Sequence, residues 1–260
     1  MKIFLSALSI FLNLIFYSCY SSALENKILF KLNNEIITTI DIMNEINYLS
    51  IINDEFNRSE KNQKIQIAKN SLIKEKIKLI ELLKYNDNIS IEDSLFENII
   101  NNYFSNLNVN SISDFNLYFK SRNIDSTYIK KKIAIEALWN QLIYAKYYKS
   151  VKIDVDEIKS NINNKKKQKE YLLSEIVFNL DSNENLELKE NIIMETIKKD
   201  SFAQAALLYS ISDTASNGGK LGWIKEAAMN NRIKKKLNNT AVGKHTNALI
   251  IPGGFLILKN

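Results

Sequence analysis

Cysteine and histidine are almost absent from this sequence, which has one of each in 260 residues. The cysteine, Cys19, lies near the end of an apolar N-terminal run, and a chain cleaved after Ala23 would contain none. Such a chain forms no disulfide and has no thiol for catalysis, and a single histidine, His245, cannot build a histidine-based metal site. The sequence therefore predicts no metal and no other cofactor.

Proline and glycine are also scarce, and they are confined to one end of the chain. The six glycines and the one proline all lie between Gly218 and Gly254. Both residue types interrupt helices, so the long stretch before Gly218 is free to be helical over most of its length.

The N-terminal residues have the pattern of a secretory signal peptide. Lys2 precedes an apolar run from Ile3 to Tyr17, and small residues follow at Ser21 and Ala23. This run is shorter than the ~20 apolar residues that a membrane-spanning helix needs. We therefore expect a signal peptide at residues 1–23. The alternative is a lipoprotein anchored through Cys19, although the bulky residues before that cysteine match a lipidation site poorly.

Charge is neither strongly one-signed nor concentrated in one place. The net charge of +6 comes from lysines scattered along the chain rather than from a continuous basic face, so no nucleic-acid partner is predicted. The hydrophobic share of 45% is sufficient to bury a core in one large or two modest domains. We attribute the abundance of Asn, Ile and Lys to genome bias and give it little functional weight.

The first half of the chain shows a strand hairpin followed by amphipathic helices. A hairpin is predicted from Leu29 to Ile37, with its turn at Asn33-Asn34, and Thr39 is predicted to cap the next helix. A second helix is predicted from Glu60 to Tyr85, with one apolar stripe facing inward. The stripe comprises Ile65, Leu72, Ile73, Ile77, Ile80 and Leu83.

Three more amphipathic helices are each preceded by a cap-like signal. They are Leu95 to Phe104 after Ser90-Ile-Glu-Asp, Phe115 to Ser121 after Ser111-Ile-Ser-Asp, and Tyr128 to Tyr148 after Asp125-Ser-Thr. Helices of this kind are stable only when they pack on one another. Aromatic residues are dense here, and they are predicted to form core, with a groove for apolar client segments as the alternative. These aromatics are Tyr103, Phe104, Phe115, Tyr118, Phe119, Trp139, Tyr144, Tyr147 and Tyr148.

The pattern changes after a lysine-rich run at Asn161 to Lys169, which we interpret as a domain boundary. The elements predicted beyond it are a strand at Tyr171 to Leu180, helices at Glu184 to Lys199 and Phe202 to Tyr209, a strand after Asn217-Gly-Gly, a helix at Ala227 to Leu237, and strands at His245 to Ile251 and Phe255 to Lys259. This order implies a small antiparallel α+β domain.

Four segments of this part carry a family resemblance. They are Asp200-Ser-Phe-Ala-Gln-Ala-Ala-Leu-Leu-Tyr-Ser, Gly218-Gly-Lys-Leu-Gly-Trp, Val242-Gly-Lys and Gly254-Phe-Leu-Ile-Leu-Lys. In order and spacing they resemble the parvulin type of peptidyl-prolyl cis-trans isomerase, or rotamase, over about residues 168 to 260. The helical segment before them opens at Leu32-Asn-Asn-Glu-Ile-Ile, ends in Val155-Asp-Glu-Ile, and resembles the N-terminal domain of the SurA family of periplasmic chaperones.

The resemblance implies a domain organisation and a location. We expect an α+β chain with a signal peptide at 1–23, a mostly α-helical SurA-like domain at 24–165 and a parvulin-like domain at 168–260. The expected location is the periplasm. SurA-like proteins normally add a C-terminal strand and helix, whereas this sequence stops at Asn260, so we expect a shortened relative or an incomplete reading frame.

The resemblance also implies an apolar proline pocket. The family forms it from a Leu, a Met and usually a Phe, spaced eight and then four residues apart, and Leu221, Met229 and Ile233 keep that spacing. Phe255 and Leu256 of the last strand join the predicted substrate-binding set. Helical spacing places Met229 and Ile233 on one helix face, a pattern that a simple hydrophobic core would also use.

The polar half of the predicted site departs from the family. Positions where parvulins often carry a histidine, a Cys or Asp, and a second histidine hold Glu175, Ser212 and Leu256, with Asp213 next to the middle one. Glu175, Ser212 and Asp213 are therefore the candidate catalytic residues, at degenerate positions. Isomerisation breaks no covalent bond and needs only a twisted amide to be favoured over a planar one, so we expect weak activity or none.

Three hypotheses follow for the whole protein. The first is a SurA-like periplasmic chaperone that binds unfolded polypeptides, mainly outer-membrane proteins, through helices and a proline-gripping domain. The second is an active parvulin-type isomerase that assists the folding of exported proteins. The third is an assembly scaffold that binds folded partners through its aromatic-rich helices.

Overall fold

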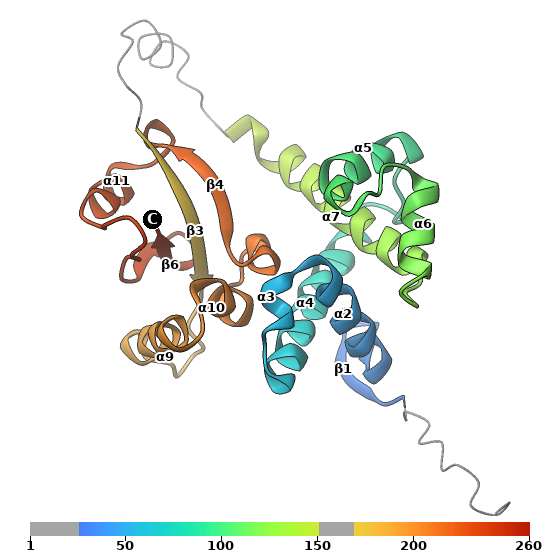
Figure 1. Ribbon diagram of the computed structural model, residues 1–260, viewed down its shortest axis with the longest axis horizontal. Helices are drawn as coiled ribbons and strands as arrows, with labels where there is room; N and C mark the ends of the chain where they lie inside the picture. Colours follow the sequence, from blue (N-terminus) through green and yellow to red (C-terminus); the bar gives the residue numbers. More distant parts are fainter. Residues whose placement is uncertain (1–25, 151–168) are drawn as a thin grey trace, which may run out of the picture.

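A computed structural model describes residues 26–150 and 169–260, which form two halves that lie side by side (Figure 1). The predicted signal peptide, Cys19, Val155-Asp-Glu-Ile and nearly all of the lysine-rich run lie outside the described residues. The predicted α+β class is confirmed: the first half is mostly helical, and the second is built on a small antiparallel sheet.

The described chain begins with the predicted hairpin. Strands β1 (Ile28–Leu32) and β2 (Glu35–Thr38) pair antiparallel around the turn at Asn33-Asn34. Asn33 has a φ of 52°, a left-handed conformation that asparagine tolerates better than most residues.

Helix α2 (Thr39–Ile52) begins one residue earlier than predicted, because Thr38 rather than Thr39 is its cap. The Thr38 hydroxyl accepts a hydrogen bond from the backbone N–H of Asp41 at 3.3 Å. The Asp41 carboxylate accepts one in return from the backbone N–H of Thr38 at 2.7 Å. The hairpin and helix are thus joined by a reciprocal capping box.

The bounds of the other helices in the first half are α3 Asp54–Asn57, α4 Lys61–Leu82, α5 Asp93–Tyr103, α6 Ile112–Lys120 and α7 Ser126–Tyr147. Helix α4 contacts α2 and α7, while α5 contacts α6, which in turn contacts α7. Ser111 and Asp125 cap α6 and α7 as predicted. The prediction for Ser90 was wrong, since α5 begins after Glu92 without a side-chain cap.

The apolar stripe predicted on α4 was partly wrong. Leu72 is buried, but Ile65, Ile77 and Leu83 are 40%, 54% and 44% exposed. Helix α4 contacts both α2 and α7, and the face between these two neighbours carries Ile67, Ala68, Leu72, Leu79 and Leu82. The buried face is therefore set by two packing partners, which helical spacing alone cannot reveal.

The aromatic residues of the helical half divide by type. Phe104, Phe115 and Phe119 are buried in one cluster with Phe96, with ring centroids 4.7 to 6.1 Å apart. The tyrosines are largely exposed, and they include Tyr103, Tyr144, Tyr147 and Tyr148. The core prediction is confirmed for the phenylalanines and wrong for these tyrosines.

The second half is a four-stranded antiparallel sheet in the order β4-β3-β6-β5. The elements are β3 Glu170–Phe178, α9 Leu186–Lys199, α10 Phe202–Tyr209, β4 Lys220–Lys225, α11 Asn231–Asn238, β5 Leu249–Ile251 and β6 Gly254–Lys259. Helices α9 and α10 cover one face of the sheet, where Ile193 and Ala205 are fully buried. Leu237 of α11 packs on the other face.

Two predicted elements of this half were too long. The helix predicted at Ala227 to Leu237 is split into a short 3₁₀ turn, η4 (Glu226–Ala228), and α11, because the Asn230 side chain starts a new helix by accepting from the Ile233 N–H at 2.9 Å. The strand predicted at His245 to Ile251 is reduced to β5, and His245 forms only an isolated bridge to Lys259.

The two halves share hydrophobic core as well as surface contacts. Leu207 of α10 is 4% exposed and belongs to the same cluster as Ile37, Leu49 and Ile67 of the helical half. Beside it, the Gln204 amide donates to the Ser59 hydroxyl at 2.7 Å. Helix α10 therefore joins the sheet to the helical half (Figure 1).

Candidate functional site: an apolar pocket beside a closed polar cluster

The predicted pocket residues meet on the face of the sheet that α11 covers. Alternation along a strand places Leu256 of β6 on this face, where it is 6% exposed. Met229, at 8% exposed, lies in the same cluster, and Leu221 and Ile233 pack against it. Four of the five predicted substrate-binding residues are thus brought together.

Met229 reaches this cluster by a route that the sequence did not indicate. Its backbone is extended, with φ −102° and ψ 146°, and it ends η4 rather than lying in a helix with Ile233. The prediction that the two residues share a helix face was therefore wrong. They converge because Asn230 turns the chain between them.

Phe255 is the predicted pocket residue that lies elsewhere. It is next to Leu256 in a strand, so its side chain points to the opposite face of the sheet. There its ring stacks on Phe178, with centroids 5.5 Å apart, beneath α9 and α10. Phe255 supports the sheet from behind and does not line the pocket.

A cavity of about 370 Å³ opens at the edge of this cluster. Ile233 and Arg232 line it together with Leu249 and Ile251 of β5. Its lining is mainly apolar, which suits a proline ring or another small hydrophobic side chain.

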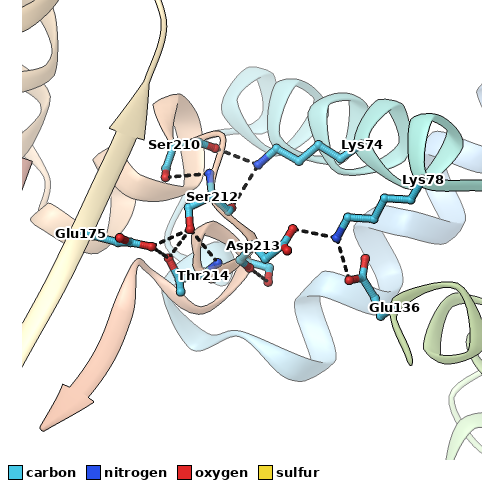
Figure 2. A network of polar contacts seen from close by, with 9 residues as sticks. Lys74, Lys78, Glu136, Glu175, Ser210, Ser212, Asp213 and Thr214 are labelled. Atoms are coloured by element: carbon cyan, nitrogen blue, oxygen red, sulfur yellow. Dashed lines mark hydrogen bonds and ion pairs between the residues drawn. The ribbon is translucent and has the colours of Figure 1, made fainter. Parts of the chain in front are cut away.

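The polar half of the site is centred on Glu175 of β3 (Figure 2). The Ser212 hydroxyl donates to Glu175 Oε1 at 2.5 Å, and the Thr214 hydroxyl donates to the same oxygen at 2.9 Å. The two hydroxyl oxygens are 3.1 Å apart. Glu175 lies between Leu173 and Val177 on the pocket face of β3, so the cluster adjoins the apolar residues.

Thr214 was missed by the sequence analysis, although a signal for it exists. Ser212 is the N-cap of the 3₁₀ turn η3 (Asp213–Asn217), and its hydroxyl accepts from the Thr214 N–H at 3.4 Å. The spacing repeats that of the Asp125-Ser-Thr cap of α7, where the cap side chain also bonds the residue two positions later. A cap interpretation of Ser212 would have placed Thr214 beside it.

Asp213 was predicted to lie with Glu175 and Ser212, and the structure separates it from them. Its carboxylate points toward the helical half and forms an ion pair with Lys78 Nζ at 2.7 Å (Figure 2). Lys78 also pairs with Glu136 of α7 at 2.7 Å. Asp213 is therefore a contact between the two halves, with no hydrogen bond to the Glu175 cluster among the described contacts.

Lys74 of α4 contacts the same loop through its backbone. Its ammonium donates to the carbonyl of Ser210 at 2.8 Å and to that of Ser212 at 3.3 Å. Burial between the two halves lowers the pKa of Lys74 to about 8, against the opposing effect of the nearby Asp213 carboxylate.

The hydrogen-bond inventory limits what the polar cluster can do. Ser212 and Thr214 each have one hydroxyl proton, and both protons lie within the cluster, on Glu175 or between the two hydroxyls. An ionised carboxylate has no proton to donate. As arranged, the cluster offers acceptors to a bound peptide but no free donor for twisting its amide bond.

These features define a class: a small α+β domain with an apolar pocket and a polar cluster on one sheet face, as expected for a parvulin-type fold. Residues 176–260 match the family model of the PPIC-type PPIase domain, or rotamase. The C-terminal region of the chain therefore carries a PPIC-type rotamase domain.

Curated relatives and solved structures extend this likeness. A 58-residue segment, 22% of this chain, is 45% identical to the chaperone SurA of Pseudomonas fluorescens Pf-5 and 40% identical to that of Pseudomonas aeruginosa. It spans only 14% of the length of either relative. A PpiC-type isomerase domain is 29% identical over 35% of this chain and 86% of its own, with a TM-score of 0.31. A SurA-like chaperone structure from Campylobacter jejuni is 18% identical over 90% of this chain and 81% of its own, with a TM-score of 0.30.

Within 26–150 and 169–260, no cluster of three or more His, Cys, Asp or Glu side chains is arranged to hold a metal ion. In the same ranges, every helix is too short or too polar to cross a bilayer.

Proposed function

We propose that this chain is an exported chaperone of the SurA type, which binds unfolded outer-membrane or secreted proteins in the periplasm. In this proposal the helical domain at 24–165 and the rotamase domain at 168–260 both contact the client. Prolyl isomerase activity is weak or lost. The proposal draws on the chaperone relatives, which the chain matches over a short segment only.

The observation that carries the proposal is that the apolar part of the site is retained, whereas its polar part offers no free hydrogen-bond donor. Leu221, Met229 and Leu256 pack in one apolar cluster, and the adjoining cavity lined by Ile233 is large enough to take a proline ring. The polar residues beside this cluster hydrogen-bond to one another, because the Ser212 and Thr214 hydroxyls both donate to Glu175. A site of this kind binds proline-containing segments without lowering the ~18–20 kcal/mol rotation barrier by much.

Two assays on one preparation test this function. An unfolded outer-membrane barrel protein is diluted from urea with and without the chain, and its light scattering is followed. In parallel, cis-trans exchange of a proline-containing peptide is measured. We expect suppressed scattering at near-stoichiometric ratios together with an exchange rate close to the uncatalysed one. Unchanged scattering would contradict the chaperone function.

A pocket variant and a surface variant sharpen the first assay. Met229→Ala removes apolar contact from the pocket and is expected to weaken proline-peptide affinity about tenfold, corresponding to ~1.4 kcal/mol. Val242→Ala is the matched control, because Val242 is 87% exposed and outside the pocket cluster. Circular dichroism checks that both variants are folded. Equal affinities for the two would mean that this pocket does not hold proline.

An active isomerase is the second candidate, favoured by the hydroxyl groups beside the pocket. Ser212 and Thr214 become donors if a bound peptide displaces them from Glu175. Catalysed exchange that is lost in Ser212→Ala, with peptide affinity retained, would favour this function over the first. Absence of both scattering suppression and exchange would leave a scaffold that binds folded partners.

A further inference from the structure

The loop that carries Ser212 and Thr214 is held from both sides. On the sheet side, the Ile211 N–H donates to the Val177 carbonyl at 2.7 Å, and the Ser210 hydroxyl accepts from the Val177 N–H at 3.1 Å. On the opposite side lies α4 of the helical half, which presents two lysines one turn apart. The loop is therefore a shared element of the two halves.

The two lysines contact the loop in different ways. Lys74 bonds backbone carbonyls at Ser210 and Ser212, so its contact depends on the path of the loop rather than on its side chains. Lys78 bonds the Asp213 carboxylate, and it also bonds Glu136, which brings α7 into the same network. The Lys78 side chain is only 9% exposed, whereas that of Asp213 is 60% exposed.

The neighbouring groups of the loop face opposite ways. The carbonyls of Ser210 and Ser212 and the carboxylate of Asp213 face α4, whereas the hydroxyls of Ser212 and Thr214 face Glu175 (Figure 2). Because the loop is fixed on its α4 side, the positions of its hydroxyls relative to Glu175 are also fixed. Without the two lysines, only the loop itself would determine where these hydroxyls lie.

We infer that Lys74 and Lys78 are positioning residues, which hold residues 210–214 so that the helical half sets the geometry of the polar cluster beside the proline pocket. The inference rests on the proposed function insofar as that pocket binds peptide. A movement of α4 relative to the sheet, such as client binding to the helices would cause, is transmitted to Ser212 and Thr214 through these contacts.

We call the contacts of Lys74 and Lys78 with residues 210–214 the clamp. Hydrogen exchange measured by mass spectrometry tests the clamp and does not depend on isomerase activity. The double variant Lys74→Met/Lys78→Met removes both contacts, and Asp213→Asn weakens one of them from the loop side at an exposed position. Lys76→Met is the matched control, because Lys76 is on the same helix but pairs with Glu35 inside the helical half. We expect amides of residues 212–219 to exchange roughly tenfold faster in the double variant, less so in Asp213→Asn, and at the wild-type rate in Lys76→Met.

A second readout addresses positioning. Proline-peptide affinity is measured on the same four proteins, and Lys78→Arg is added as a conservative variant. We expect the double variant to alter proline-peptide affinity by at least about threefold, whereas Lys78→Arg, which keeps the charge, retains the wild-type affinity. Unchanged amide exchange at 212–219 in the double variant would overturn the clamp. Faster amide exchange with unaltered peptide affinity would overturn the positioning role. If the wild-type chain bound no proline peptide, the proposed function would be refuted. The amide hydrogen exchange rates at 212–219 would still show whether Lys74 and Lys78 hold the loop.

Discussion

The carboxylate of Glu175 engages two hydroxyl protons that a bound peptide would otherwise receive. The family resemblance implies a histidine at this position, and a neutral imidazole both donates and accepts hydrogen bonds. An ionised glutamate only accepts, so the Ser212 and Thr214 hydroxyls turn toward it at 2.5 and 2.9 Å. The carboxylate at position 175 thus sets the direction in which both neighbouring hydroxyls donate.

Replacing this carboxylate is expected to increase isomerase activity. Glu175→Gln removes the charge and supplies an amide donor, which leaves donors available to the peptide. We expect kcat/KM for a proline peptide to rise about tenfold, less than the ~10²–10³ attributed to a fully preorganised donor. Glu175→Asp, which keeps the charge, serves as the control. A Gln variant as slow as the Asp variant would show that the closed cluster does not limit turnover.

The pH dependence of stability is expected to report on Lys74. Its pKa is about 8 in the folded chain, below the ordinary value of 10.5, and the charged groups around it are Asp213, Lys78 and Glu136. Between about pH 8 and pH 10.5, Lys74 holds a proton more often in the unfolded chain than in the folded one. The free energy of unfolding therefore rises with pH across this window. Urea unfolding at pH 7.5 and 9.5 checks this. The wild type should gain stability relative to Lys74→Met as pH rises, whereas parallel curves would contradict the lowered pKa.

A buried ion cluster inside the helical half offers a stability test at the same scale. Lys132 of α7 pairs with Glu45, which is fully buried, at 2.7 Å, and also with Glu75. Burial acts to lower the pKa of Lys132, but these two carboxylates outweigh it and hold the pKa well above its usual value. The Tyr128 hydroxyl also donates to Glu45, at 2.8 Å.

Removing this lysine is expected to be costly, because it leaves buried negative charge uncompensated. We expect Lys132→Met to lower the free energy of unfolding by about 3–5 kcal/mol. Lys130→Met on the same helix is the control: its pair with Asp93 is exposed, and we expect ~1 kcal/mol or less. Similar losses in both variants would argue against a buried, compensated charge.

At the scale of elements, the sequence predicted the hairpin, the order of the helices and the order of strands and helices in the α+β half. Each of these depends on local spacing, caps and turn residues. Ser111, Asp125 and the Asn33-Asn34 turn are examples. The exposed Ile77 and the inner Phe255 could not be assigned locally, since their burial is decided by which elements pack beside them. The break at Asn230, which brings Met229 to the pocket in an extended conformation, was hidden within an apparently continuous helix.

Strand β4 offers an element-scale test through two glycines, Gly219 just before the strand and Gly222 within it. Gly219 has a φ of 75°, and a Cβ there would lie 2.1 Å from the Glu175 carbonyl oxygen. Gly222 has a similar φ of 80° but open space around it. We expect Gly222→Ala to cost ~1–2 kcal/mol from backbone strain alone, and Gly219→Ala to cost a further ~1–3 kcal/mol from overpacking.

Thermal or urea unfolding of the two glycine variants gives the comparison directly. Gly219 also links the loop to the sheet, since its N–H donates to the Thr214 carbonyl at 2.9 Å and its carbonyl accepts from the Glu175 N–H at 2.7 Å. Gly219→Ala should therefore disturb the polar cluster as well. Equal stabilities would mean that β3 and β4 are less closely apposed than described.

At the scale of the whole molecule, the two halves are fused rather than tethered. Leu207 of α10 is buried in the helical core, Ser59 and Gln204 bond across the junction, and the side chain of Asn53 donates to the Ser216 carbonyl. A cavity of only about 80 Å³ remains between α4 and the loop at Ser212. The sequence predicted two separate units, because contacts between distant segments leave no local pattern.

This fusion predicts one cooperative unfolding transition. The two tryptophans report on different halves, with Trp139 in α7 and Trp223 in β4. Single-tryptophan variants, Trp223→Phe and Trp139→Phe, should therefore show coincident urea midpoints by fluorescence. Leu207→Ala, which we expect to cost ~2–4 kcal/mol, should separate the midpoints. Separate midpoints before that change would contradict a shared core.

The central claim is that the site grips proline while its polar half stays closed, and exchange NMR on a proline-containing peptide from an outer-membrane barrel protein tests it most directly. One titration reports both peptide affinity and cis-trans exchange rate. We predict saturable line shifts with an exchange rate close to that of the free peptide, and a roughly tenfold weaker affinity in Met229→Ala. Rapid catalysed exchange in the wild-type chain, or no binding at all, would contradict it.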